Sequence, residues 1–231
     1  MKILCLIPAR SGSKGLKNKN IKKIKGKSLI EITYLFAKNL RIFKHIVVST
    51  DSKKYLKKIR DKNFLSPFLR PKKLAKDNTT DLDLMIYELK RYEKFFNVKY
   101  DYLCLLQPTS PLRKKKHLKA CIKILKKSNP DAIWSVSPID KKFHPIKQVF
   151  IKNDYLKYFQ KDGKNFVSRQ KLEQSYIRNG VAYFFSRKTI LEKKNILPQK
   201  TKFLVIDKNK IANIDSKSDL EFAIKKFKKN D

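Results

Sequence analysis

Short apolar runs alternate with amphipathic stretches along most of this chain of 231 residues. Residues 3–7 are continuously apolar and end at Pro8, which is typical of a strand buried on both faces. Apolar side chains recur at close to helical spacing over residues 29–40, and another apolar run follows at 46–48. The pattern predicts strand, helix and strand, in this order, at the N-terminus.

The same alternation continues toward the C-terminus. It predicts helices at residues 53–61, 81–96, 115–127 and 218–229, and strands at 102–106, 132–136 and 203–206. Repeated strand–helix units favour an α/β fold with a mostly parallel sheet, and such a sheet binds ligands beyond the carboxyl ends of its strands. At the last helix, Ser218 and Glu221 have the spacing of a capping box.

Residues 141–188 break this pattern. His144-Pro145 and Gly163 interrupt the segment, aromatic residues are frequent, and no strand–helix unit is recognisable. We interpret the chain as a single domain over residues 1–231 with a small inserted arm at 141–188.

Lysine dominates the charge of the chain. The 57 Lys and Arg residues stand against 20 Asp and Glu, a formal net charge of +37, and only nine of the 57 are Arg. Nucleic-acid readers concentrate Arg on one face, whereas these lysines are spread through the chain, so we interpret them as a solvated surface. A basic nucleic-acid-binding protein is the alternative from another class, and it predicts binding that weakens steeply with salt. No recognition-helix, RNA-binding or zinc motif supports it, and we expect no specific nucleic-acid partner.

The cysteines and the N-terminus bear on the compartment. Cys5, Cys104 and Cys121 are widely spaced and form no CxxC pair, which predicts neither a disulfide framework nor a zinc site and fits a reducing cytoplasm. The apolar start is far shorter than the roughly 20 residues that span a bilayer. We therefore expect no membrane or targeting segment.

The loop after the first predicted strand carries the clearest candidate chemistry. Residues 8–20 read PARSGSKGLKNKN, in which small residues let the backbone approach a ligand and exposed amides can hold phosphate oxygens. Arg10, Lys14 and Lys19 add positive charge. The spacing matches neither a Walker A loop nor a Rossmann GxGxxG. Composition alone is compatible with a phosphate-binding loop or with a plain basic surface loop.

Further motifs follow this loop in a fixed order through nearly the whole chain. They are Ile7-Pro8-Ala9-Arg10, Gly12-Ser13-Lys14-Gly15 and Lys19-Asn20; Leu69-Arg70-Pro71 with Leu74-Ala75 and Asp77; LLQPTSPLR at 105–113; His144-Pro145 with Lys147; Arg169-Gln170; and Asn179-Gly180 with Tyr183. In this order and spacing they resemble CMP-N-acylneuraminate synthetases, the cytidylyltransferases that activate sialic acids. The resemblance implies a three-layer α/β/α nucleotide-binding fold of the nucleotide-diphospho-sugar transferase type. It also implies a homodimer in which the arm reaches the neighbouring active site.

The resemblance further implies a reaction of CTP with an N-acylneuraminate that gives CMP-N-acylneuraminate and diphosphate. The anomeric hydroxyl of a nine-carbon 2-keto acid sugar would attack the α-phosphate. The same reaction on legionaminate, pseudaminate or 3-deoxy-manno-octulosonate is the alternative. Displacement at phosphorus needs cations on the phosphate oxygens more than it needs a covalent nucleophile, which agrees with the basic loop.

The same resemblance assigns residues to the nucleotide. The catalytic set would be Arg10, Lys14, Lys19 and Asp215, and the nucleotide-binding set Arg10, Gly12, Ser13, Lys14, Lys19, Asn20, Arg70, Asp77, Thr79 and Asp81. Arg10 and Lys14 are the candidates for stabilising transition-state charge. Asp81 is a candidate acceptor for the 4-amino group of cytosine, although helix capping by Thr79, Thr80 or Asp81 is equally compatible with the sequence.

The acid sugar and the metal complete the expected site. The sugar would contact Gln107, Arg169, Gln170, Arg178, Asn179 and Tyr183. Gln107 is also compatible with a simple turn before Pro108, and Arg178 ranks below Arg169 because some family members place this arginine at the position of Ile177. The family's Asp-Ile-Asp, which supplies carboxylates for Mg²⁺, reads Asn213-Ile214-Asp215 here. Because Mg²⁺ is normally held by one or two carboxylates with phosphate oxygens and water, we expect Asp215 and Asn213 to bind it, with weaker affinity.

Overall fold

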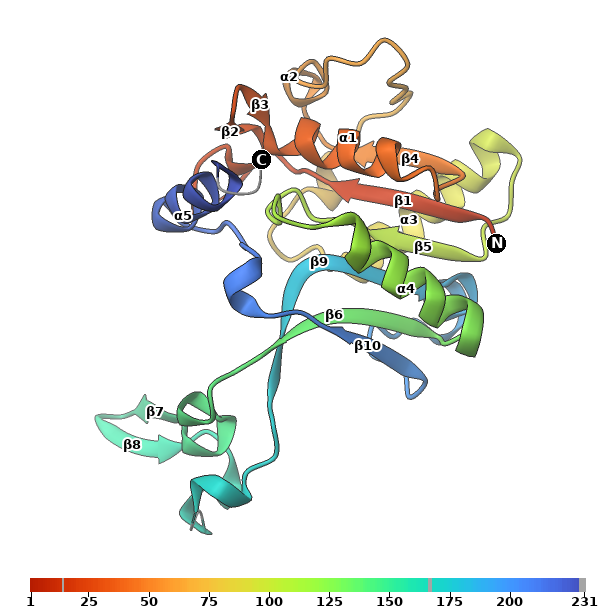
Figure 1. The fold of residues 1–231 in the computed structure, drawn as a ribbon. Helices are drawn as coiled ribbons and strands as arrows, with labels where there is room; N and C mark the ends of the chain where they lie inside the picture. Colours follow the sequence, from red (N-terminus) through yellow and green to blue (C-terminus); the bar gives the residue numbers. More distant parts are fainter. Residues whose placement is uncertain (14, 166–167, 229–231) are drawn as a thin grey trace.

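A six-stranded sheet forms the centre of the molecule (Figure 1). The computed structural model describes residues 1–13, 15–165 and 168–228, with only the backbone of Arg169 and Lys228. The sheet has the order β10-β6-β9-β5-β1-β4. Its strands are β1 (Ile3–Pro8), β4 (His45–Ser49), β5 (Tyr102–Leu105), β6 (Ala132–Pro138), β9 (Tyr176–Ser186) and β10 (Thr201–Val205). All neighbouring pairs are parallel except those of β9, so the predicted mostly parallel sheet is confirmed.

Helices cover both faces of this sheet. α1 (Leu29–Leu40) and α4 (Lys115–Ser128) pack on one face, and α3 (Asp81–Phe96) packs on the other. Side chains of β1 alternate between these layers: Cys5 faces α1 and α4, whereas Leu4 faces α3. Both layers are apolar, which explains why this strand has no polar positions. The predicted three-layer α/β/α fold is confirmed.

The remaining elements lie around the sheet. The short strands β2 (Lys23–Ile24) and β3 (Lys27–Ser28) form a hairpin, and α5 (Lys217–Lys228) packs beside it. α2 covers only Lys53–Leu56 and is shorter than predicted. The predicted capping box at Ser218 and Glu221 is wrong, because Ser216 and Asp219 exchange these hydrogen bonds two residues earlier. Within the described residues, no helix is long and apolar enough to cross a membrane.

β9 is the main element that the sequence pattern missed. The sequence places it within the predicted arm at 141–188, but it lies in the middle of the sheet, antiparallel to both β5 and β6. Residues 179–185 are buried, whereas residues 176–178 at its start are exposed. Since an antiparallel strand needs no preceding helix, no strand–helix unit marks it in the sequence. The arm therefore ends near residue 175 rather than 188.

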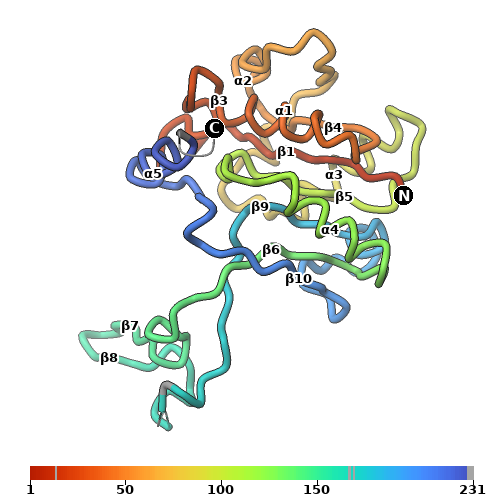
Figure 2. Tube along the Cα trace, viewed as in Figure 1, coloured from red at the N-terminus to blue at the C-terminus, as the bar shows by residue number. Residues whose placement is uncertain are grey.

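The arm itself projects from the sheet. The trace in Figure 2 shows the chain leaving at the end of β6 and returning at the start of β9. Its tip is a hairpin of β7 (Val149–Lys152) and β8 (Tyr155–Tyr158). Asn153 and Asp154 both have positive φ, at 52° and 61°, as a tight hairpin turn of type I′ requires. All eight strand residues of this hairpin are exposed.

Candidate active site

A pocket of about 770 Å³ opens at the carboxyl ends of the parallel strands. Five cationic side chains and three carboxylates line it, in addition to polar and a few apolar residues. Most of the residues predicted for the site line this pocket, namely Arg10, Ser13, Lys19, Asn20, Arg70, Asp77, Thr79, Asp81, Gln107, Arg178, Tyr183, Asn213 and Asp215. Residues from the two halves of the chain thus converge where a parallel sheet presents its ligand-binding groups.

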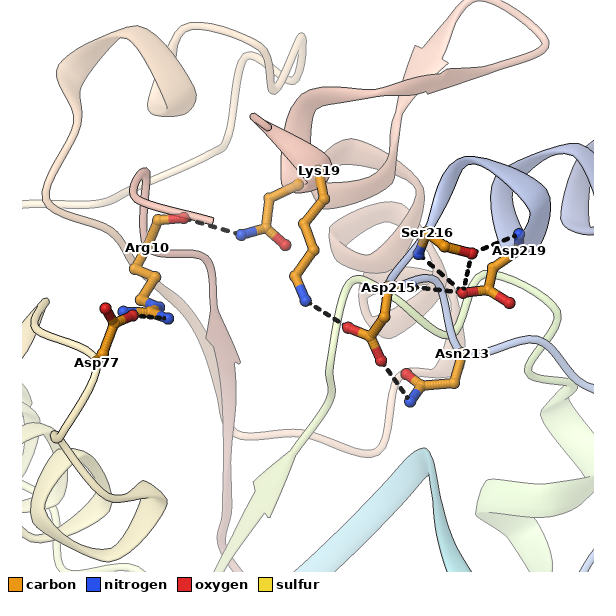
Figure 3. Close-up of polar contacts among 8 residues, drawn as sticks. Arg10, Lys19, Asp77, Asn213, Asp215, Ser216 and Asp219 are labelled. Atoms are coloured by element: carbon orange, nitrogen blue, oxygen red, sulfur yellow. Dashed lines mark hydrogen bonds and ion pairs between the residues drawn. The ribbon is translucent and has the colours of Figure 1, made fainter. Parts of the chain in front are cut away.

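The loop after β1 forms the phosphate side of this pocket. Arg10 pairs with Asp77 at 2.6 Å between Nη2 and Oδ1, and its backbone oxygen accepts a 3.0 Å hydrogen bond from Asn20 Nδ2 (Figure 3). Asn20 is buried, so it holds the loop from behind. The buried Ser13 Oγ has no hydrogen-bond partner among the described residues. A buried hydroxyl without a partner is costly, so this group suits a ligand oxygen.

Two residues that the sequence did not suggest brace this loop. Asp51, just beyond β4, accepts hydrogen bonds from the Ser11 amide at 2.8 Å and from the Ser11 hydroxyl at 2.7 Å. Burial alone would raise the pKa of Asp51, but these hydrogen bonds, together with one from the Asp51 backbone and the charge of Arg70, outweigh it and lower the pKa below its ordinary value. Tyr55 Oη reaches both Ser11 O and Asn18 Oδ1. The feature of the sequence that could have indicated Asp51 as a site residue is its position directly after a predicted strand.

The C-terminal loop meets the phosphate loop at an ion pair. Lys19 Nζ lies 2.7 Å from Asp215 Oδ1, and Asn213 Nδ2 donates to Asp215 Oδ2 at 3.3 Å (Figure 3). The backbone amide of Asp215 donates to Asp219, which also caps α5 and so fixes the loop to a helix end. A Cβ on Gly15 would lie 2.8 Å from the Asp215 carbonyl oxygen, so a glycine is needed where the two loops approach.

The opposite wall contains Arg70 and the start of α3. Arg70 is 5% exposed, and its Nε donates to Ser49 Oγ at 2.8 Å while Nη2 donates to Ser49 O at 2.7 Å. Burial lowers the pKa of Arg70 to about 10. Thr80 is the N-cap of α3 and shares a capping box with Asp83. Of the capping alternatives, Thr80 therefore has this role, and Asp81 in the first turn lines the pocket.

The third wall is built by the turn after β5 and by β9. Gln107 forms the predicted turn through its backbone oxygen, which accepts from Ser110 N at 3.2 Å and from Arg113. The same residue lines the pocket, so the predicted turn is confirmed and the contact of Gln107 with the sugar stays a prediction. Arg113, which is buried and was given no role from sequence, also donates to Gly180 O at 3.4 Å. Arg113 thereby ties the β5 turn to β9.

Asn179 is expected to contact the sugar, but it does not line the pocket. Its side chain is buried, accepts a hydrogen bond from Ser135 Oγ at 2.6 Å and donates to Ser137 Oγ at 3.1 Å. The amide therefore faces the neighbouring strand β6, where it fixes the turn that places Gly180. Gly180 N in turn donates to Tyr183 Oη at 2.7 Å. The Asn179 side chain thus lies behind the wall of the pocket, and its contact with the sugar stays a prediction.

The two candidate arginines for the sugar occupy different places. Arg178 lines the pocket and lies over the Trp134 ring, with Cζ 5.1 Å from the ring centroid. Arg169 and Gln170 belong to a short 3-10 turn of the arm, Arg169–Lys171, and Gln170 does not line the pocket of its own chain. The side chain of Arg169 and all of Lys14 lie outside the described residues. Gly12 is exposed beside the pocket.

Fold and site together define a class. A mostly parallel sheet between two layers of helices, with a cationic pocket large enough for a polyanion at its strand ends, is typical of α/β nucleotide-binding enzymes. Residues 4–230 match the family model of the cytidylyltransferases. The chain belongs to this cytidylyltransferase family and is a nucleotidyltransferase, which favours the enzyme over the nucleic-acid-binding alternative.

Individual relatives agree with this assignment. A pseudaminic acid cytidylyltransferase of Campylobacter jejuni is 31% identical over 231 residues, covering 100% of this chain and 98% of the relative. A CMP-N,N'-diacetyllegionaminic acid synthase of the same species is 33% identical, covering 97% and 94%. A solved CMP:2-keto-3-deoxy-manno-octonic acid synthetase in complex with CTP superimposes with a TM-score of 0.71 at 14% identity over 100% of both chains, and therefore shares the fold.

We predict that Gly180→Ala removes activity through a steric contact. Gly180 has a φ of +74°, and an added Cβ would lie 2.5 Å from Ser110 Oγ and 2.8 Å from Gln107 Oε1. Left-handed backbone costs a residue with a Cβ roughly 1–2 kcal/mol of unfolding free energy. Displacement of Gln107 should additionally lower kcat/KM by more than about tenfold, measured as pyrophosphate release.

Gly26→Ala is the matched control. Gly26 has a φ of +76°, but an added Cβ would meet nothing within 4 Å. Both variants should lose the stability that left-handed backbone costs, Gly180→Ala should lose more because of its steric contacts, and only Gly180→Ala should lose activity. Equal kcat/KM for the two variants would contradict the steric role of Gly180.

Proposed function

We propose that this protein transfers the cytidylyl group of CTP to the anomeric hydroxyl of a nine-carbon 2-keto acid sugar. The observation that carries the proposal is that three groups of residues line one pocket. They are the phosphate loop, the wall that contains Arg70 and Asp81, and the wall that contains Gln107 and Tyr183. A volume of about 770 Å³ is enough for a nucleotide beside a second ligand. N-acylneuraminate is the sugar that the sequence motifs suggest, and the names of the relatives support pseudaminate and legionaminate. The eight-carbon 3-deoxy-manno-octulosonate is the remaining alternative.

In this reaction the anomeric hydroxyl gives up its proton to water and its oxygen forms a bond to the α-phosphorus. The bond between the α-phosphorus and the oxygen that bridges to the β-phosphate breaks, so that diphosphate leaves with this oxygen. Arg10 and Lys19 would bind the non-bridging and leaving oxygens, and Ser13 would donate its hydroxyl to them. Both cations are already paired with carboxylates of the chain, Arg10 with Asp77 and Lys19 with Asp215. The triphosphate therefore exchanges these ion pairs for its own, and the cations are held near their working positions beforehand.

We also propose that Asp215 and Asn213 hold Mg²⁺. Both offer hard oxygen donors on the pocket wall, and the Asp215 side chain is 63% exposed. The described residues contain no group of three His, Cys, Asp or Glu side chains that could hold a metal ion, so phosphate oxygens and water would complete the shell. When bound, the ion would neutralise phosphate charge and lower the pKa of the attacking hydroxyl.

Two further proposals concern assembly and compartment. The exposed apolar side chains of the β7–β8 hairpin, with Arg169 and Gln170 on the same arm, support a homodimer in which each arm covers the partner's pocket. The free and buried thiols of Cys5, Cys104 and Cys121 fit the reducing cytoplasm, where we propose that the enzyme works.

The activity is tested by pyrophosphate release with a panel of N-acetylneuraminate, legionaminate, pseudaminate and 3-deoxy-manno-octulosonate. Release should require CTP, Mg²⁺ and one sugar together.

Asp215→Ala should lose more than about tenfold in turnover at saturating CTP, because it removes the carboxylate proposed to hold Mg²⁺ at the reacting phosphates. Asp207→Ala changes an exposed carboxylate outside the pocket and should keep the parental rate. A near-parental rate for Asp215→Ala would refute its metal-binding role.

The departure at Asn213 is tested by restoring a carboxylate. Asn213→Asp places a second negative charge beside Asp215, so the Mg²⁺ concentration for half-maximal rate should fall several-fold. The measurement is initial rate against Mg²⁺ concentration at fixed CTP and sugar. A requirement for Mg²⁺ that stays equal or rises would show that Asn213 takes no part in metal binding.

The arm is tested by its oligomeric state. Ile151 and Leu156 are partners in the β7–β8 register and are 74% and 70% exposed. The parent should sediment at twice the mass of one chain, and a double variant with Glu at both positions should sediment as a monomer, because burying these charges at an interface is unfavourable. A monomeric parent at micromolar concentration would argue against the shared pocket.

A further inference from the structure

Glu88 is a buried carboxylate that the chemistry described so far does not use. It lies on α3 and is 0% exposed. Its Oε1 accepts a 2.5 Å hydrogen bond from Ser49 Oγ, and its Oε2 accepts a charge-assisted hydrogen bond from Arg91. A buried carboxylate is costly unless it is fully paired, so the chain must hold these three groups in one arrangement.

Ser49 connects this carboxylate to the wall of the pocket. A hydroxyl has one proton, and Ser49 donates it to Glu88. Its lone pairs are then available to Arg70 Nε, which donates to Oγ at 2.8 Å, while Arg70 Nη2 donates to Ser49 O at 2.7 Å. Glu88 thus determines the direction in which the Ser49 hydroxyl donates its proton. The hydroxyl oxygen and the Ser49 carbonyl oxygen then fix the plane of the Arg70 guanidinium.

A second connection runs through Arg91. Besides Glu88, this side chain donates to the backbone oxygen of Leu69 at 3.1 Å, next to Arg70 in the chain. It also lies 4.8 Å from the centroid of the Phe68 ring. Glu88 therefore restrains both the side chain of Arg70 and the backbone that carries it.

We propose that Glu88 is a positioning residue for nucleotide recognition, which acts through Ser49 and Arg91 to orient the Arg70 guanidinium toward the pyrimidine. This inference rests on the proposed binding of CTP. Cytosine presents two adjacent acceptors, O2 and N3, whereas N3 of uracil carries a proton. A guanidinium held in one plane can donate to both acceptors of cytosine and would leave a donor facing a donor with uracil. The Glu88–Ser49–Arg70 connection therefore favours CTP over UTP.

The test is equilibrium binding of CTP and UTP to the full-length protein with Mg²⁺ and without sugar. Glu88→Gln keeps the shape of the side chain but weakens its hydrogen bond from Ser49 and removes its charge. We expect CTP affinity to fall about tenfold while UTP affinity changes little, so that the preference for CTP narrows. A role in folding alone would lower Tm and leave the CTP to UTP ratio unchanged.

Glu93→Gln is the matched control on the same helix. Glu93 is also a paired carboxylate, with Arg187 Nε at 2.8 Å and Nη2 at 3.1 Å, but it does not line the pocket. This variant should lose thermal stability and keep the parental ratio. Ser49→Ala leaves the Glu88–Arg91 pair in place and should reproduce the narrowed ratio, so it carries the test if Glu88→Gln does not fold.

The outcomes separate the two proposals. A parent that binds CTP and UTP equally overturns the proposed cytidine site and this inference with it. A parent that prefers CTP, with the preference retained in both Glu88→Gln and Ser49→Ala, overturns the positioning role of Glu88 alone.

Discussion

The antiparallel pairing of β9 between β5 and β6 is the constraint on which the rest of this structure depends. It joins the β4-β1-β5 part of the sheet, which carries the phosphate loop, to the β6-β10 part, which leads to Asp215. It also sets the direction of the chain, so that β9 enters at the ligand-binding edge and brings Arg178 and Gly180 there. The arm leaves the sheet from the same edge (Figure 1), and residues 176–178, where the chain returns from it, line the pocket.

Charge in the pocket is organised in two zones. At the open side, the cations of the phosphate loop are paired with exposed carboxylates, and such pairs contribute little stability in a solvated setting. They are therefore easily exchanged for phosphate oxygens. At the closed side, Arg70, Glu88 and Arg91 are largely buried and hydrogen-bonded, where loss of one partner leaves a desolvated charge. The exchangeable groups suit a triphosphate that enters and leaves, and the fixed groups suit recognition of one base.

Most of the strand and helix assignments were available from local patterns. The continuous apolar run of β1, the periodicity of α1 and α3, and the alternation of strands with helices each depend on a few neighbouring residues. The boundaries were less well determined. Ser218 and Glu221 have a valid capping spacing, yet Ser216 and Asp219 form the box, because the loop from Asn213 is anchored through Ile214 N to Thr109 O and the helix must begin where that loop ends.

The sequence by itself determined the α/β class, the cationic loop and the ordered motifs that relate this chain to cytidylyltransferases, since these are written in short windows of residues. Only the tertiary structure decided that Arg178 lies in the pocket of its own chain while the Arg169–Lys171 turn lies on the arm, that Asn179 faces β6, and that Glu88 supports Arg70. These facts depend on contacts between residues far apart in the sequence. Tertiary packing determines which side of a strand faces a pocket and which neighbour donates a hydrogen bond to a buried carboxylate. It does so because every buried polar group must find a partner once the whole sheet is formed.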